Sequence, residues 1–156
     1  PATLRIVVEE RKPVAFIYGR GLNLIDGQGY LMPVPQTNYN WNLPFITGVK
    51  ERLGTLGEKS ISLKACRGAE ILAYARYLKS PLYEVISEIN MSNSKDLRFK
   101  LIQGGAIVRL DQKKYQQNVY LLSQYFTKYL DWSKLAAIEY FDVRFKDQLI
   151  IKENHS

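Results

Sequence analysis

Strand-like segments at both ends of the chain constrain its fold more than any other feature of the sequence. Near the start, Leu4, Ile6 and Val8 follow the two-residue period of a β-strand. The last part of the chain predicts two adjoining strands, over residues 136–145 and 148–152. We therefore expect a sheet that uses both ends of the chain and leaves one of its edges open.

Between these ends, the pattern predicts further short strands and two helices. Apolar residues at three- and four-residue spacing predict helices over residues 60–79 and 113–130. Residues 33–60 are rich in proline, asparagine and glycine, and we expect them to be irregular. Further strands are expected over residues 14–18, 22–26, 30–32 and 83–90, together with a hairpin over residues 97–110. The predicted fold class is α+β, with a mostly antiparallel, curved sheet and two main helices packed on one of its faces.

Composition indicates a soluble globular domain. The 156 residues suit one domain, and 46% hydrophobic with 24% charged residues is ordinary for such a domain. Cys66 is the only cysteine, so no intramolecular disulfide can form. No apolar run approaches the roughly 18 residues that would span a bilayer. Because residue 1 is a proline inside a strand-like pattern, we expect this chain to be a piece of a longer protein.

The chain carries few of the residues that enzymes and metal sites need. Its only histidine, His155, is next to the last residue, where a rigid contact with a nucleophile is hard to build. One cysteine and one histidine cannot form a usual zinc site. Glu9 and Glu10 are neighbours on an expected strand and would point to opposite faces. We expect no enzyme activity, no cofactor, no metal and no small-molecule substrate.

The net charge of +7 would attract nucleic acid, anionic lipid or an acidic protein segment. The basic residues are scattered along the chain, which is typical of a solvated surface. As an alternative function we consider a basic domain that binds single-stranded nucleic acid. Its candidate residues are Arg98, Lys100, Tyr140 and Phe145.

Several motifs in one order resemble bacterial cell-division proteins of the FtsQ/DivIB family. Residues 3–15 resemble the family's Leu-x-Ile-x-Val strand followed by Glu-Arg-x-Pro-Val-Ala, where the chain passes from a POTRA domain to a β domain. The other matching segments are Leu24–Gly29, Leu43–Gly48, Leu101–Leu110 and Phe141–Phe145. Residues 49–62 match no motif of the family.

The resemblance implies a domain division, a location and a function. Residues 1–12 would be the last strand of a truncated POTRA domain, residues 13–152 the β domain, and residues 153–156 a disordered tail. The whole protein would cross the bacterial inner membrane once, with this portion in the periplasm at the division septum. It would be a non-enzymatic divisome scaffold that binds FtsB/FtsL-type division proteins and helps regulate septal peptidoglycan synthesis, with no nucleic acid as partner.

The family resemblance also predicts the partner-binding site, because its members receive a partner segment on their C-terminal strands. An extended peptide can add to an open strand edge through main-chain hydrogen bonds. Arg144 would pair with a partner carboxylate, and Phe145 would anchor apolar contact. Family members vary over residues 146–152, so the resemblance assigns no single contact there. The predicted partner-binding residues are Arg144, Phe145, Lys146, Gln148, Leu149, Ile150, Ile151 and Lys152.

Overall fold

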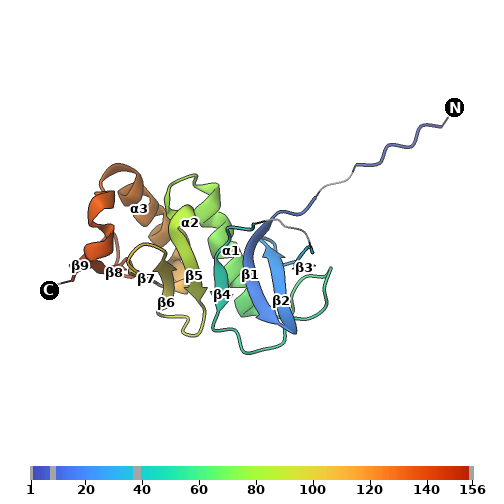
Figure 1. The fold of residues 1–156 in the computed structure, drawn as a ribbon, viewed down its shortest axis with the longest axis horizontal. Helices are drawn as coiled ribbons and strands as arrows, with labels where there is room; N and C mark the ends of the chain where they lie inside the picture. Colours follow the sequence, from blue (N-terminus) through green and yellow to red (C-terminus); the bar gives the residue numbers. More distant parts are fainter. Residues whose placement is uncertain (1, 8–9, 37–39, 155–156) are drawn as a thin grey trace.

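A computed structural model describes residues 2–7, 10–36 and 40–154, and it has an α+β fold built on one mixed sheet. Nine strands lie in the order β3-β2-β1-β4-β5-β6-β7-β8-β9, and Figure 1 shows them side by side across the molecule. Five of the eight strand pairs are antiparallel and three are parallel. The strands are β1 (Pro13–Gly19), β2 (Gly21–Asp26), β3 (Leu31–Pro33), β4 (Phe45–Thr47), β5 (Ile86–Asn90), β6 (Leu97–Leu101), β7 (Ile107–Leu110), β8 (Ile138–Asp142) and β9 (Ile150–Glu153).

One face of the sheet is covered and the other is open. The strand β6 alternates strictly between buried and exposed residues, which is the pattern of a strand with one solvated face. The register brings one apolar residue from each of seven neighbouring strands into a row on the covered face, and these residues are Ile17, Ile46, Ile89, Phe99, Val108, Phe141 and Ile151. All of them belong to the hydrophobic core or pack against it.

Three α-helices and two short 3₁₀ helices complete the fold. They are α1 (Leu63–Tyr77), α2 (Leu82–Val85), α3 (Tyr115–Lys128), η1 (Gln112–Lys114) and η2 (Trp132–Ala137). The helix α1 packs against β1, β2, β4 and α3, and α3 also packs against β7. In α1 the buried residues include three alanines and a glycine, whose small size lets the helix lie close to the sheet.

The structure corrects two expectations in the middle of the chain. The region expected to be irregular contains β4, a three-residue strand that is parallel to both of its neighbours. The strand expected over residues 83–90 begins only at Ile86, because Leu82–Val85 form the short helix α2. The hydroxyl of Tyr83 donates a hydrogen bond of 2.8 Å to the Val14 carbonyl, so α2 attaches to β1 by a side chain.

The ends of the chain also differ from the expected strands. Residues 2–7 form no strand in this structure, and Figure 1 shows them reaching away from the sheet; Val8 and Glu9 lie outside the described residues. The strand expected over residues 136–145 is reduced to β8, since its first residues belong to η2 and the chain leaves the sheet after Asp142. Glu153 is the last residue of β9 and not part of a tail, and the Asn154 amide donates a 2.7 Å hydrogen bond to the Ala137 carbonyl.

Candidate functional site

The two edges of the sheet differ in the state of their backbone groups, and β3 forms the closed one. The Leu31 amide donates to the Glu58 carbonyl at 3.0 Å, and the Leu31 carbonyl accepts from the Gly57 amide at 2.8 Å. Pro33 faces the same side of the strand as Leu31 and has no N–H. This edge therefore presents no free amide donor along β3.

The strand β9 forms the open edge. It is the last strand in the sheet order, and within the described ranges it pairs only with β8. Alternate residues of a strand direct their N–H and C=O groups to each side, so half of these groups on β9 face outward with no strand to receive them. Figure 1 shows β9 at the end of the molecule opposite the N-terminal segment.

Of the predicted binding residues, three belong to β9 and lie on both faces of the sheet. Ile151 pairs with Phe141 and lies on the covered face, where it packs against the core. Ile150 and Lys152 lie on the open face, and Ile150 is 41% exposed. The Lys152 ammonium is 3.3 Å from the Glu139 carboxylate.

The other predicted binding residues form the connection from β8 to β9. Leu149 packs against the core, whereas Phe145 is 51% exposed. A turn follows Phe145, in which the Gln148 amide donates to the Phe145 carbonyl at 3.3 Å. Lys146 and Gln148 are exposed in this turn. The strand expected to begin at Gln148 thus begins two residues later, at Ile150.

Arg144 belongs to a group of five charged residues that we call the ionic cluster, made of Asp96, Arg98, Arg109, Asp142 and Arg144. The Arg109 guanidinium donates two hydrogen bonds of 3.0 Å to the Asp96 carboxylate. The Arg144 guanidinium donates two to Asp142, of 3.0 and 2.9 Å. Such two-pronged pairs are among the stronger hydrogen bonds in proteins.

The ionic cluster lies on the open face, beside the open edge. The register pairs Arg98 with Arg109, Arg109 with Asp142, and Asp142 with Ile150 of β9. Two further contacts join the pairs, because an Arg109 nitrogen is 3.9 Å from Asp142 and an Arg144 nitrogen is 4.0 Å from Asp96. The cluster therefore fixes the side chains next to β9.

Both carboxylates of the ionic cluster are held in the charged form. Hydrogen bonds from Arg109 lower the pKa of Asp96 far below its ordinary value, and they outweigh the partial burial that opposes this. Burial raises the pKa of Asp142, but the hydrogen bonds and charge of Arg144 lower it more, so the net shift is downward. Carboxylates in this state act as fixed acceptors at neutral pH.

Sequence reasoning found Arg144 but not the carboxylate that binds it in the structure. The partner expected for Arg144 was on another protein, whereas its guanidinium contacts Asp142 of the same chain. A signal for this pair was available, since Asp142 and Arg144 are two residues apart and a strand places such residues on one face. Asp96 carried no signal, because it follows a turn and meets Arg109 only through the pairing of β6 with β7.

Some of the residues considered for nucleic-acid binding lie together on the open face. Lys100 pairs with Ile107, and Ile107 pairs with Tyr140, so the three lie in one row. Arg98 is 2.8 Å from Asp96 and is therefore paired within the chain. A phosphate backbone needs unpaired cations, and this face pairs much of its positive charge internally.

The described residues contain no group of three or more His, Cys, Asp or Glu side chains that could hold a metal ion. His155 lies outside the described residues. No helix within the described ranges is both long and apolar enough to cross a membrane.

These features define an α+β domain whose single mixed sheet has one closed edge and one open edge, with an ionic cluster beside the open one. The chain belongs to the FtsQ/DivIB family: the family model described as "Cell division protein FtsQ/DivIB, C-terminal" matches residues 15–144. The matched segment ends at Arg144, before β9. Membership of this family supports a role in cell division.

Curated relatives are named for the same process. The chain is 28% identical to the cell division protein FtsQ of Koribacter versatilis (strain Ellin345), over 97% of this chain and 43% of that protein. It is 28% identical to the FtsQ of Geobacter sp. (strain M21) and 24% identical to that of Geotalea daltonii (strain DSM 22248 / JCM 15807 / FRC-32). Both alignments cover 98% of this chain and 55% of the relative. The chain thus spans about half the length of the curated relatives it matches.

Proposed function

We propose that this chain is the non-catalytic, periplasmic part of a cell-division scaffold, and that an FtsB/FtsL-type protein adds a segment to β9 as a further strand. In this proposal residues 1–12 belong to a preceding POTRA domain, and a transmembrane helix outside this chain anchors the protein in the inner membrane. Binding at the septum helps to regulate peptidoglycan synthesis there. The curved sheet carries its two long helices on one face, and the partner reaches the opposite face and the β9 edge.

The observation that carries the proposal is the contrast between the two sheet edges. At β3, the outward amide and carbonyl of Leu31 already have partners. At β9, no strand of the described ranges bonds the outward backbone groups, so an extended segment can bond them. Ile150 in β9 and Phe145 in the loop before β9 both expose apolar surface, and such surface can supply the anchor that main-chain bonds lack.

The test is a calorimetric titration of the chain with the periplasmic segment of the FtsB-like protein from the same organism. We expect saturable binding that Ile150→Pro or Ile151→Pro abolishes, because proline removes an amide donor and its ring obstructs pairing. Asp142 directs its backbone groups to β9 and pairs with Ile150, so Ile150→Pro removes a donor to β8. Ile151→Pro removes an outward donor and leaves the bonds to β8 intact. Circular dichroism identifies the variant that remains folded.

Phe145→Ala tests the apolar anchor, and we expect it to weaken binding by about tenfold or more. The matched control is Tyr77→Ala, which removes a 77% exposed aromatic side chain from α1. Binding that survives both proline variants in folded protein would move the site away from β9. Equal losses of affinity from Phe145→Ala and Tyr77→Ala would mean that Phe145 is not part of the binding site.

A further inference from the structure

One cavity of the described residues lies far from β9, at the other end of the sheet. It has a volume of about 910 Å³ and is formed by the end of β1, the start of β2, β3 and the loop of residues 49–61. That volume falls within the range of known ligand sites, about 300–1,000 Å³. Its lining residues take no part in the proposed binding at β9.

The loop that walls the cavity is held in shape by its own hydrogen bonds. The Leu53 carbonyl accepts from the Ser60 hydroxyl at 2.6 Å and from the Ile61 amide at 2.9 Å, which closes the neck of the loop. The bonds between Leu31 and residues 57–58 then attach the loop to β3. A cavity fixed in this way loses little conformational entropy when a ligand binds.

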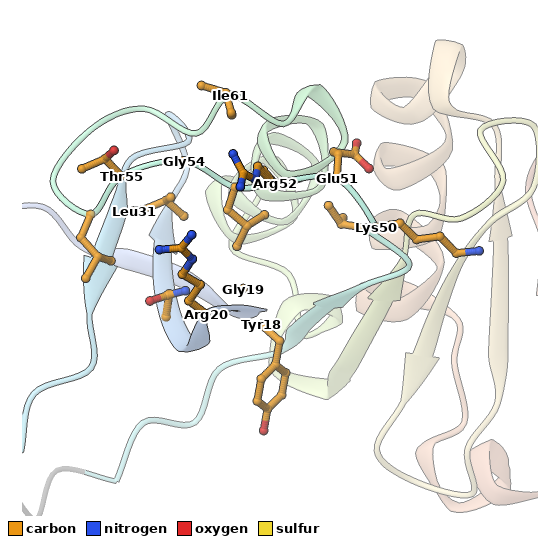
Figure 2. A pocket seen from close by; sticks show the side chains of 14 residues that line it. Tyr18, Gly19, Arg20, Leu31, Lys50, Glu51, Arg52, Gly54, Thr55 and Ile61 are labelled. Carbon is orange, nitrogen blue, oxygen red and sulfur yellow. The ribbon is translucent and has the colours of Figure 1, made fainter.

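Two arginines of the cavity have no carboxylate partner within the part of the chain that the structure describes. Arg20 follows β1 and Arg52 belongs to the loop, and Figure 2 shows both guanidinium groups turned toward the same space. No ion pair or hydrogen bond of either side chain is found among the described residues. By contrast, Arg98, Arg109 and Arg144 of the ionic cluster all have carboxylate partners.

The other charged residues at the cavity do not neutralise this pair. Glu51 is the only carboxylate among the lining residues, and it accepts a 3.1 Å hydrogen bond from the hydroxyl of Ser62, which caps α1. Lys50 also lines the cavity, but its side chain extends away from it in Figure 2. The cavity is therefore lined by two guanidinium groups, of Arg20 and Arg52, and this kind of group suits a carboxylate.

Apolar side chains form the rest of the lining. Leu31 and Leu53 are buried, while Leu56 is 49% and Ile61 is 70% exposed. A hydrated phosphate or sugar polymer would leave these exposed side chains in water, whereas an apolar side chain of a ligand would cover them. The combination of guanidinium groups and apolar lining fits a ligand that has both a carboxylate and an apolar side chain.

We propose that this cavity is a second binding site, which takes a short acidic peptide segment with a carboxylate held between Arg20 and Arg52 and a neighbouring apolar side chain against Leu56 and Ile61. The site does not rest on the function proposed for β9. An aspartate or glutamate within a partner chain can supply the carboxylate.

The test is a titration of the ¹⁵N-labelled chain, followed by NMR, with three blocked tetrapeptides. The first alternates aspartate and leucine, the second replaces aspartate with asparagine, and the third replaces leucine with serine. We expect the first peptide to shift signals of the loop, including Gly54 and the Nε groups of Arg20 and Arg52. We expect the second and third to bind about tenfold more weakly.

Arg20→Gln and Arg52→Gln are each expected to weaken binding of the first peptide by about tenfold. The control, Lys128→Gln, removes an exposed cation at the end of α3 and is expected to change nothing. In the last part of the experiment the chain is titrated with inorganic phosphate and with pyrophosphate.

Three outcomes overturn the proposal. Equal shifts from the aspartate and asparagine peptides would show that the arginines do not select a carboxylate. Tighter binding of phosphate or pyrophosphate than of the first peptide would assign the cavity to another class of anion. An absence of shifts at millimolar concentrations of every probe would remove the site altogether.

Discussion

At the scale of single residues, the ionic cluster shows how positive charge is managed on the open face. Three arginines share two aspartates, so the cluster as a whole keeps one positive charge. Asp96 is the member on which most depends, because it accepts hydrogen bonds from both Arg98 and Arg109. Its side chain is only 13% exposed, so water cannot easily replace these bonds.

Replacing Asp96 with asparagine is expected to lower the free energy of unfolding by about 1–3 kcal/mol at neutral pH. The change removes the charge that Arg98 and Arg109 share and leaves the guanidinium groups of Arg109 and Arg144 to repel one another. Urea unfolding measures the loss. The control is Asp147→Asn, which removes an exposed carboxylate, and asparagine also tolerates the positive φ of 53° found there.

The loss in free energy of unfolding caused by Asp96→Asn is also expected to depend on pH. The folded-state pKa of this carboxyl is below its ordinary value of 3.8, so the folded chain binds fewer protons and its stability rises with pH. The contribution is fully present above about pH 5 and is lost as the pH falls through the folded-state pKa. The difference in the free energy of unfolding between wild type and Asp96→Asn should therefore narrow steadily as the pH falls from about 5 to about 2. A difference that stays constant over this range would contradict the charge-based explanation.

At the scale of secondary-structure elements, the serine that precedes α1 and a serine within α3 have opposite surroundings. The Ser62 hydroxyl oxygen accepts from the Ala65 amide at 3.1 Å and caps the start of α1, which packs against three strands. The Ser123 hydroxyl, in the middle of α3, is buried and has no hydrogen-bond partner among the described residues. One hydroxyl stabilises its helix, and the other carries a desolvation cost.

We expect Ser62→Ala to lower the free energy of unfolding by about 1 kcal/mol, because the first turn of α1 loses its cap. Ser123→Ala is its matched control and should be neutral or slightly stabilising, because it removes a buried hydroxyl that lacks a partner. Urea unfolding with a common slope compares the two variants. An equal loss from both would mean that the cap adds nothing beyond packing.

The elements that could be predicted from the sequence are those with local signals. The periodicity of α1 and α3, and the glycine turn between β6 and β7, lie within one segment each and were predicted correctly. The strand β4 has three residues between Pro44 and Gly48, and both of its partners are distant in sequence. Four-residue α2 is too short to show a helical period.

Part of the candidate site likewise could not be predicted from local sequence patterns. The apolar run of Ile150 and Ile151 predicted a strand, and β9 contains both residues. That β9 is an edge strand depends on the sheet order, and the Arg109 pair with Asp96 depends on register between strands. Arg20 and Arg52 line the same cavity, and the loop that contains Arg52 has no recognisable motif. Such features arise from tertiary pairing, which no local pattern encodes.

At the scale of the whole molecule, the charge of +7 coexists with an open face on which many cations are paired. The surplus acts over a distance and favours the approach of an acidic segment more than its final fit. The two sites proposed here lie toward opposite ends of the sheet, one at β9 and one beside β3. A long partner, or two partners, could therefore occupy the chain at the same time.

Binding of the partner segment to the whole chain is expected to weaken several-fold when salt rises from about 0.05 M to about 0.5 M, because the ions screen the attraction. Stopped-flow kinetics should place most of this change in the association rate. Sucrose in place of salt serves as the control for solvent effects other than screening. An association rate that does not change with salt would mean that the surplus charge has no part in the encounter.

The closed edge at β3 limits how many sheet edges of this chain can pair with a strand of another molecule. Two copies could join once, through β9 of each. Among the described strands, the joined pair would then offer no further receptive edge, since Leu31 is already bonded and Pro33 has no amide hydrogen. Open-ended growth into fibrils needs two receptive edges on every unit. A sheet with one receptive edge can therefore expose a partly apolar strand without open-ended polymerisation.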